Sequence, residues 1–400
     1  MKVLRGGVTS PKGFLASIAS CGIKKSGRPD LALLFSETPA QCAAVFTTNR
    51  IKSGSVIVSA KNVKNGVSRA VIVNSGNANC CVGKREIEDA EEILGLLSGE
   101  LNLDKKELLI ASTGIIGKRL PIGKIKKKVA NLTKDLKKTN GTKFAKAIMT
   151  TDTVHKEIAV AVRLGGKEAI IGGAVKGSGM ISPDMATMLA FFTTDACIDR
   201  NALNEAFKES VSESFNRITV DGDMSTNDTS IIFANGIAGN RIIKKNGPDY
   251  AGFLTALKYV SKELARKIIM DGEGATKFVE VLVKGVSALK DAEKVARHVA
   301  NSNLVKTMIA GGDPNWGRIA ASVGSSGVSI DKTKLNIYFG DRLVMRDGSG
   351  TRCPKKTLSG IFQKKDIKIT IDLKSGKESA SIWTCDLTED YVKINSKYEA

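Results

Sequence analysis

Residues 176–196 read KGSGMISPDMATMLAFFTTDA, a glycine-rich loop joined to a short run of strand-forming residues. Pro183 interrupts the loop, and β-branched and aromatic residues follow from about Thr187 onward. This pattern predicts a strained turn that feeds directly into a β-strand. A threonine that opens a strand is usually structural, because its branched side chain suits extended backbone.

A threonine in this place also has a chemical use. Cleavage of the peptide bond between Ala186 and Thr187 would release an α-amine, whose ordinary pKa of about 7.7 to 8.0 suits a general base near neutral pH. Such an amine can activate the hydroxyl of its own residue. The chain has only two histidines, His155 and His298, so we expect chemistry without a histidine triad or a histidine-rich metal site.

Short elements alternate on both sides of this segment, and 400 residues exceed what one hydrophobic core usually organises. We therefore predict a mixed α/β protein with two or three lobes. Expected strands lie at 31–35, 43–48, 55–60, 70–76, 108–112, 156–164, 167–175, 277–285, 334–348, 366–373 and 379–387, and expected helices at 87–101, 118–143, 201–216, 248–267 and 290–309.

The chain is basic, with 61 lysines and arginines against 41 aspartates and glutamates and a formal net charge of +20. This excess alone fits nucleic acid, acidic metabolites or simply a basic cytoplasmic protein. Many lysines fall within 118–143, where apolar residues at helical spacing predict a helix with a solvated cationic face. No helix-turn-helix, zinc-finger or RNP motif accompanies the charge, so we expect no nucleic-acid partner and keep a basic nucleic-acid-binding protein as an alternative.

The expected compartment follows from hydropathy and cysteine usage. No apolar run approaches the roughly 18 to 20 residues of a membrane span, and none follows the basic N-terminal residues. We therefore expect a cytoplasmic protein with no membrane partner. The seven cysteines are scattered apart from the adjacent Cys80 and Cys81, which match no metal-finger spacing and cannot easily bridge, so we expect free thiols.

A series of further motifs accompanies the central segment. In chain order with it, they are VTSPKGF, FTTNR, VNSGNAN, STGIIGK, MTTDT, KGSGMISPDMATML, SFNRITVDGDMSTNDTS, DGEGATK and GGDPNWGR. Over nearly the whole chain this order resembles the ornithine acetyltransferase family of arginine biosynthesis. The resemblance implies a layered α/β/β/α fold with N-terminal-nucleophile chemistry. It also implies autoproteolysis between Ala186 and Thr187, which divides the chain into an alpha segment, 1–186, and a beta segment, 187–400.

The implied reaction is acetyl transfer from N2-acetyl-L-ornithine to L-glutamate through an acetyl-Thr187 intermediate. The resemblance implies that no metal or organic cofactor is needed, and it leaves open whether acetyl-CoA is a second acetyl donor. The two cleaved chains are expected to stay together as a heterotetramer of two alpha and two beta chains. Within enzymes, the alternative is a self-processing aminopeptidase or amidase, because the same nucleophile can pass its acyl group to water.

The resemblance also assigns roles to single residues. Thr113 and Gly114 in STGIIGK would form the oxyanion hole that stabilises charge on a tetrahedral intermediate. Taken alone, this pair also fits an ordinary glycine turn after strand 108–112, and a lone lysine or glutamate is commonly a surface charge. The residues expected to bind substrate are Thr150, Lys176, Thr187, Glu273 and Asn395.

The C-terminus departs from the family pattern, which usually ends in something like INADYR followed by Thr or Ser. This chain instead reads INSKYEA and closes at Ala400. A substrate-contacting hydroxyl is therefore missing there, and we exclude Ala400 as a side-chain contributor. The expected consequence is weaker substrate binding or a shift in the acceptor used.

Two motifs resemble ligand sites that the chain does not complete. DGDMSTND from Asp221 begins like a calcium loop, but Thr226 replaces the glycine and Ile232 the final glutamate of that motif, so we exclude calcium there. GGDPNWGR from Gly311 has the glycines of a phosphate loop without its GK[ST] ending. We predict a tight turn near the active site or at an interface rather than nucleotide binding.

Overall fold

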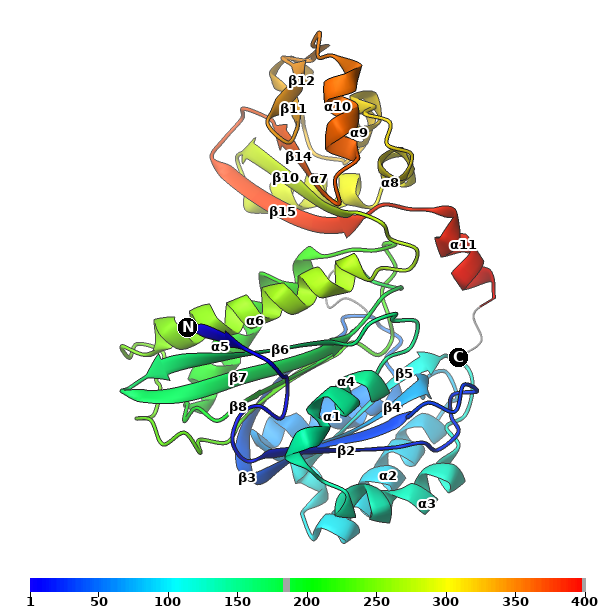
Figure 1. Ribbon diagram of the computed structural model, residues 1–400, viewed down its shortest axis with the longest axis vertical. Helices are drawn as coiled ribbons and strands as arrows, with labels where there is room; N and C mark the ends of the chain where they lie inside the picture. The colour runs from blue at the N-terminus through cyan, green and yellow to red at the C-terminus, as the bar shows by residue number, and fades with distance from the viewer. Residues whose placement is uncertain (183–187, 398–400) are drawn as a thin grey trace.

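Two β-sheets, each with its own hydrophobic core, make up the body of the protein (Figure 1). The computed structural model describes residues 1–182 and 188–397, so Ala186, Thr187 and Ala400 lie outside the described residues. Within those ranges, one sheet has nine strands and the other six. The six-stranded sheet is built entirely from residues after 277, whereas the nine-stranded sheet takes strands from both sides of the predicted cleavage position.

The nine-stranded sheet folds over on itself into two layers, and strand β3 joins them. The first part of β3, as far as Gln41, pairs with β4 with a register shift between Phe35 and Ala40, and its second part, from Gln41 to Phe46, pairs with β9. In spatial order the strands are β1 (Lys2–Leu4), β6 (Lys156–Leu164), β7 (Lys167–Lys176), β8 (Leu189–Thr194), β9 (Thr229–Ala234), β3 (Leu31–Phe46), β4 (Val67–Asn77) and β5 (Leu108–Ile115), with β2 (Phe14–Ala19) beside β3.

Helices cover the outer face of each layer, which gives an α/β/β/α sandwich (Figure 1). The helices α5 (Arg200–Ser212) and α6 (Tyr250–Met270) pack on the layer of β6 to β9. The opposite layer is covered by α1 (Gly54–Asn62), α2 (Arg85–Leu101) and α3 (Ile122–Lys134). The predicted fold class is therefore confirmed.

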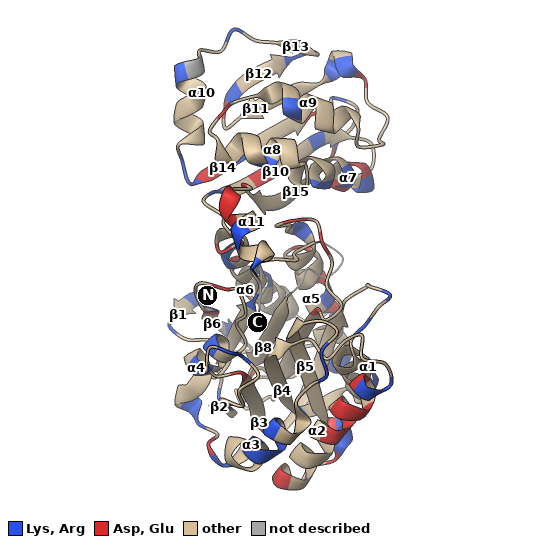
Figure 2. Cartoon of the chain, turned by 90° about the vertical axis from the view of Figure 1, so that its right-hand side faces the viewer, with Lys and Arg blue, Asp and Glu red and all other residues tan. Residues whose placement is uncertain are grey.

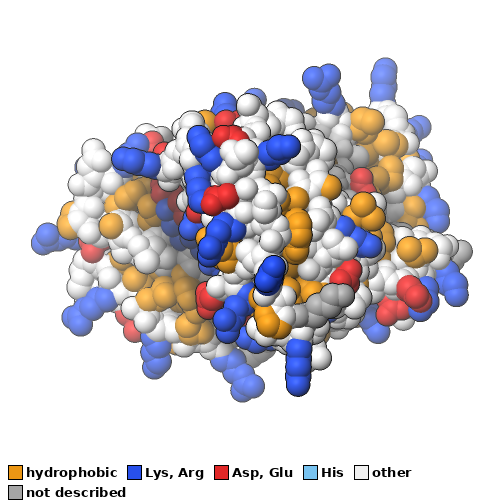
Figure 3. Space-filling view, turned by 90° about the horizontal axis from the view of Figure 1, so that it is seen from above, with side chains coloured by type: hydrophobic (Ala, Val, Ile, Leu, Met, Phe, Trp, Pro, Cys, Tyr) orange, Lys and Arg blue, Asp and Glu red, His pale blue; other side chains and the backbone are white. Residues whose placement is uncertain are grey.

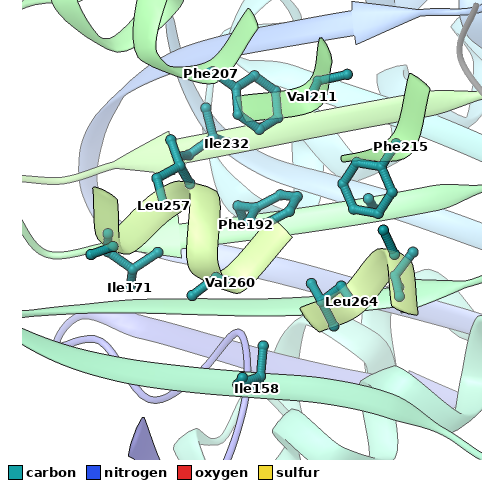
Figure 4. Packing of buried hydrophobic residues seen from close by; sticks show 14 of the residues in the cluster. Ile158, Ile171, Phe192, Phe207, Val211, Phe215, Ile232, Leu257, Val260 and Leu264 are labelled. Atoms are coloured by element: carbon teal, nitrogen blue, oxygen red, sulfur yellow. The ribbon is translucent and has the colours of Figure 1, made fainter. Parts of the chain in front are cut away.

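Strand β8, which belongs to the segment 176–196, lies at the centre of the fold and contributes side chains to two cores. Successive side chains of a strand point to opposite faces. Phe191 accordingly belongs to the core between the two sheet layers, and Phe192 to the core under α5 and α6. The ring of Phe192 lies edge-on to the rings of Phe207 and Phe215 (Figure 4). Since both faces are covered, this strand reads as continuously apolar rather than alternating.

The six-stranded sheet forms a separate lobe whose core lies under four helices. Its strand order is β13 (Ser349–Gly350), β12 (Arg342–Arg346), β11 (Asn336–Phe339), β14 (Asp366–Asp372), β10 (Phe278–Val286) and β15 (Glu378–Cys385). The helices are α7 (Leu289–Ala300), α8 (Asn303–Ala310), α9 (Trp316–Gly324) and α10 (Lys355–Phe362). After β15, the chain turns back toward the larger lobe as α11 (Glu389–Ser396) (Figure 1).

The strand predicted at 55–60 is wrong, because these residues lie in helix α1. The Ser53 side chain caps the helix by accepting a hydrogen bond from the Val56 N–H. The buried Ser59 hydroxyl, later in the same helix, donates to the Ile110 carbonyl at 2.6 Å and accepts from the Ile110 N–H at 2.8 Å. Packing of small polar side chains against β5 therefore overrides the strand preference of the valines and isoleucine.

Other predicted boundaries shift. The strands expected at 31–35 and 43–48 are the two parts of β3, and the helix expected at 290–309 is α7 followed by α8. The lysine-rich stretch 118–143 is not one helix, because α3 ends at Lys134 and a short 3-10 helix, Lys138–Asn140, precedes α4 (Gly141–Ala147).

In the views of Figures 2 and 3, lysines and arginines are distributed over several elements rather than gathered in one place. Lysines of α3 lie beside the acidic helix α2, and Lys126 forms an ion pair with Glu92 (Figure 2). Viewed from above, lysines and arginines lie among apolar, neutral and acidic side chains (Figure 3). In the part of the chain that the structure describes, no helix is long and apolar enough to cross a membrane. All seven cysteines are free, and the sulfur atoms of Cys80 and Cys81 are 3.7 Å apart.

Candidate active site

A small pocket lies where β7 ends and β8 and β9 begin. Its volume is about 120 Å³, below the 300–1,000 Å³ typical of pockets for drug-sized ligands, so it suits a small metabolite. Six residues predicted for the site, from five separate segments, meet there. The described residues that line it are Thr113, Gly114, Ile116, Thr150, Thr151, Lys176, Gly179, Met180, Ser225, Thr226, Asn227, Glu273 and Asn395.

Thr113 and Gly114 lie in the last part of β5, which runs parallel to β4. The alternative of an ordinary turn is wrong here, because the strand continues to Ile115. Gly114 has a φ of +134°, and a Cβ at this position would lie 2.3 Å from the carbonyl carbon of Gly76. Only glycine allows this close approach of two strands beside the pocket.

Asn227 fixes the strand that carries this pair. Its buried side-chain amide donates to the carbonyl of Ala78 at 2.6 Å and to the carbonyl of Ser112 at 2.8 Å. Thr226 donates in turn to the side-chain oxygen of Asn227 at 2.6 Å. The segment before β9 therefore holds the residue immediately before Thr113.

Lys176 is the buried cation of the pocket, at the end of β7. Its ammonium donates to the Thr150 hydroxyl at 3.1 Å, so these two predicted residues are in direct contact. Burial lowers the pKa of Lys176, and the carboxylates of Asp152 and Asp228 oppose that shift. Such a cation is desolvated and can pair strongly with a ligand carboxylate.

Under Lys176 lies a buried charge cluster that the sequence did not point out. Lys156 is completely buried and donates to Asp152 at 2.6 Å and to Asp271 at 2.5 Å. Asp152 also accepts from the backbone N–H groups of Thr150 at 3.0 Å and Gly177 at 2.8 Å. Burial by itself would raise the pKa of Asp152, but the nearby lysines hold it below its usual range.

Glu273 supplies a negative charge on another wall. Its carboxylate accepts from the Asn395 side chain at 2.7 Å, which brings α11 of the smaller lobe to the pocket. The Glu273 N–H donates to the Ser178 carbonyl at 2.9 Å. A Cβ at Gly179 would lie 2.3 Å from this carboxyl group, so the glycine leaves room for it. The pocket therefore offers a cation and an anion to one ligand.

The predicted nucleophile precedes the first described residue after the gap. Met188 is held by its N–H, which donates to Asp228 at 3.1 Å, and Leu189 pairs with Lys176 across the sheet.

The remaining motifs have other structural roles. The Asp221 carboxylate accepts from the N–H groups of Met180 at 2.6 Å and Ile181 at 2.9 Å. In the described residues, no group of three His, Cys, Asp or Glu side chains could hold a metal ion. GGDPNWGR forms the tight turn between α8 and α9 and the first residues of α9. It lies in the smaller lobe and does not line this pocket, so its predicted place near the active site is wrong, and its place at an interface stays a prediction.

Sequence reasoning missed Asp152, Ser225, Thr226, Asn227 and Asp228. The last four follow one another in a motif that carried the family resemblance and was weighed as a calcium loop, but its residues were given no role in the site. Several hydroxyl and amide side chains in a row, directly before the apolar strand β9, could have indicated a polar site. Asp152 stood within MTTDT, beside Thr150, and gave no separate signal.

Comparison with known proteins gives a consistent set of relatives. The ArgJ family model matches residues 15–400. The "Arginine biosynthesis bifunctional protein ArgJ" of Caldanaerobacter subterraneus is 45% identical over 402 residues, covering 100% of both chains. The protein of the same name from Geobacter sulfurreducens is 46% identical over 390 residues, covering 97% of this chain and 99% of its own.

A solved structure is also similar. It is the crystal structure of the arginine biosynthesis bifunctional protein argJ from Bacillus halodurans, at 41% sequence identity and a TM-score of 0.51. The match covers 98% of that chain but only 52% of this one.

Proposed function

This chain belongs to the ArgJ family, and from that membership and the pocket we propose that it transfers an acetyl group from N2-acetyl-L-ornithine to L-glutamate. It is an acyltransferase of arginine biosynthesis. The observation that carries the proposal is the meeting of Thr113, Gly114, Lys176 and Glu273 around one pocket, where Lys176 pairs with Leu189 at the start of β8.

Self-cleavage comes first. The Thr187 hydroxyl attacks the Ala186 carbonyl carbon, the peptide C–N bond breaks, and an ester joins the two residues. Water then hydrolyses the ester and leaves Thr187 with a free α-amine.

Acetyl transfer then follows in two half-reactions. With its α-amine as base, the Thr187 hydroxyl attacks the acetyl carbonyl of acetyl-ornithine, and ornithine leaves with the returned proton. The amine of glutamate attacks the resulting ester and carries the acetyl group away. Thr113 and the Gly114 backbone stabilise the oxyanion in both tetrahedral intermediates.

Charge pairing sets the register of both substrates. The Lys176 ammonium binds an α-carboxylate, and Glu273, held by Asn395, binds an ammonium group. The Thr150 hydroxyl accepts a hydrogen bond from the Lys176 ammonium and so holds it in place for the substrate carboxylate. None of these steps calls for a metal or an organic cofactor, and the cleaved chains would form a cytoplasmic heterotetramer of two alpha and two beta chains.

Product analysis tests the proposal. Purified enzyme with N2-acetyl-L-ornithine and L-glutamate should yield ornithine and N-acetyl-glutamate in equal amounts. Acetate without N-acetyl-glutamate would instead identify an amidase, the alternative from the same chemistry. Replacing acetyl-ornithine by acetyl-CoA tests the second donor: turnover would make the enzyme bifunctional, and its absence would restrict the enzyme to recycling the acetyl group.

Asp152→Asn should shift the pH dependence of substrate binding. Asp152 raises the pKa of the buried Lys176, so its loss lowers that pKa further. The ammonium is present only below its pKa, and KM should therefore begin to rise at a lower pH in the variant, while kcat changes less. Steady-state kinetics between pH 6 and about 10 measure the shift.

The matched control is Asp271→Asn. It removes the other carboxylate that Lys156 binds, and that carboxylate does not contact Lys176. Breaking a buried pair commonly costs about 3–5 kcal/mol, so both variants should lose thermal stability to a similar degree. Only Asp152→Asn should move the KM profile. Equal movement in both variants would contradict a specific role of Asp152 toward Lys176.

A further inference from the structure

Lys156, the first residue of β6, has an unusual environment for a lysine. Its side chain is completely buried, and its ammonium donates to the carboxylates of Asp152 at 2.6 Å and Asp271 at 2.5 Å. Lysine is almost never fully buried unless it is paired. Lys156 does not line the pocket, and no step of the proposed reaction uses it. Its role must therefore lie in what its two partners hold.

Stability alone does not account for this buried charge. Taking an ammonium and two carboxylates out of water costs free energy that their attraction only partly repays. Well-packed apolar side chains of similar volume commonly stabilise a core at least as well. A buried ion pair supplies something that apolar contacts do not, namely short charged hydrogen bonds with defined directions. Lys156 is therefore suited to fixing the positions of other groups.

Asp152 holds the cationic wall of the pocket. Its carboxylate accepts from the N–H of Thr150 at 3.0 Å and from the N–H of Gly177 at 2.8 Å. The Thr150 hydroxyl in turn accepts from the Lys176 ammonium at 3.1 Å, and Gly177 directly follows Lys176 in the chain. Asp152 therefore fixes the backbone beside both the pocket lysine and its hydroxyl partner.

Asp271 holds the anionic wall, since it lies on the segment that leads to Glu273. Its carboxylate accepts from the Thr153 N–H at 3.1 Å and from the Thr153 hydroxyl. Its backbone carbonyl accepts from the Ser178 hydroxyl at 2.5 Å, and the Glu273 N–H donates to the Ser178 carbonyl at 2.9 Å. The segment that carries the pocket carboxylate is therefore tied to residues of the opposite wall.

One ammonium group thus joins the two walls. Through Asp152 it fixes the position of Lys176, and through Asp271 it fixes that of Glu273. Such bonds are electrostatically strong in a low-dielectric interior, so the spacing between the walls is stiff. Ser178 forms a second, uncharged link between the same walls.

We propose that Lys156 is a positioning residue that sets the distance between the Lys176 ammonium and the Glu273 carboxylate. The inference rests on the proposed function, because it takes N2-acetyl-L-ornithine as the acetyl donor. That donor carries an α-carboxylate at one end and a side-chain ammonium at the other. A fixed spacing of the two protein charges selects the length of the carbon chain between the two ligand charges. Lys156 thereby favours derivatives of ornithine over those of longer or shorter diamino acids.

Competition between N2-acetyl-L-ornithine and N2-acetyl-L-lysine, which is one methylene longer, tests the proposal in Lys156→Met. One methylene is commonly worth about 10–200-fold in kcat/KM, so wild type should prefer acetyl-ornithine by at least about 10-fold and the variant by less than about 3-fold. The ratio does not depend on the folded fraction, because both donors compete for the same enzyme molecules. Burial and, to a smaller extent, the Lys156 charge lower the pKa of Lys176, but the two donors share the α-carboxylate that this lysine binds.

Lys258→Met is the matched control. The Lys258 ammonium also bridges two carboxylates, those of Glu209 and Glu213 at 2.6 Å each, but it joins α6 to the end of α5 and does not line the pocket. This variant should keep the wild-type preference. Ser178→Ala is a milder test, because it deletes one hydroxyl and leaves the buried charges in place. Its preference for acetyl-ornithine should fall by at least about 2-fold, as for the loss of one hydrogen bond.

A variant that is not cut or not active is compared by binding. Ornithine and lysine, the products that leave, keep both anchoring groups, so their affinities by calorimetry give the same preference without acetyl transfer. An unchanged preference in folded Lys156→Met would overturn the inference. If that variant does not fold, an unchanged preference in Ser178→Ala does so instead. An equal loss of preference in Lys258→Met, or a wild type that accepts both donors equally, has the same consequence.

The outcomes also separate this inference from the proposed function. If wild type neither transfers the acetyl group of acetyl-ornithine nor binds ornithine, the proposed function fails. If wild type does both and prefers the ornithine derivative, while the folded variants keep that preference, only the role of Lys156 fails.

Discussion

Thr187→Ala is expected to remain a single chain of 400 residues and to lose acetyl transfer by at least about 10⁴-fold, as for other removed nucleophiles. One substitution removes both reactions, because the same hydroxyl attacks the Ala186 carbonyl and later the acetyl carbonyl. Intact mass under denaturing conditions reports the first loss, and N-acetyl-glutamate formation reports the second. Wild type should give two masses that correspond to 1–186 and 187–400.

The matched control is Thr187→Ser, which keeps a hydroxyl at the same atom position. It should still cut and still transfer, more slowly than wild type. An uncut wild-type chain that nevertheless transfers acetyl groups would separate the two reactions and refute the need for cleavage. A cut Thr187→Ala chain would place the nucleophile elsewhere.

Gly114→Ala should lower kcat by about 10²–10³-fold, the range for losing an oxyanion donor. The alanine Cβ would lie 2.3 Å from the carbonyl carbon of Gly76 at a φ of +134°, so the β4 and β5 backbones must move apart. The movement displaces the donors of residues 113 and 114 from the oxyanion position. Since ground-state binding depends on Lys176 and Glu273, KM should change less than kcat.

Gly117→Ala controls for backbone strain in the same segment. Gly117 also has a positive φ, +81°, but nothing lies within 4 Å of the position that a Cβ would occupy. It should lose some stability, on the order of 1 kcal/mol, with little change in kcat. Equal loss of kcat in both variants would show that strain in this segment, rather than the position of the donors, limits the reaction.

The resemblance carried by the ordered motifs implied a layered fold, and the structure confirms it. The layers have a physical cause: strands that are apolar on both faces need packing partners on both sides. Residues 55–60 show where such reasoning stops. SVIVSA has strand-forming side chains, but its serines bond to β5 in a helix. A contact between residues about fifty positions apart decided the conformation, and no local pattern contains it.

The site was predicted as a set of residues, not as an arrangement. The resemblance named Glu273 and Asn395. The structure adds that Asn395 lies on α11 and that its side chain donates a hydrogen bond to the Glu273 carboxylate. Their roles toward substrate stay predictions. Asp152 and Asp228 were missed because an acidic residue in a sequence is usually a solvated charge, and only burial reveals otherwise.

The mixed origin of the nine-stranded sheet constrains how the enzyme can be made. Strand β8 pairs with β7, and β9 pairs with β3, so each predicted segment contributes strands whose partners belong to the other. A ribosome that released 187–400 alone would deliver strands with open edges, which invite aggregation. Synthesis as one polypeptide keeps the partners at high local concentration until they have paired. The proposed cut is therefore expected to come after assembly of the sheet, because each segment needs strands of the other as partners.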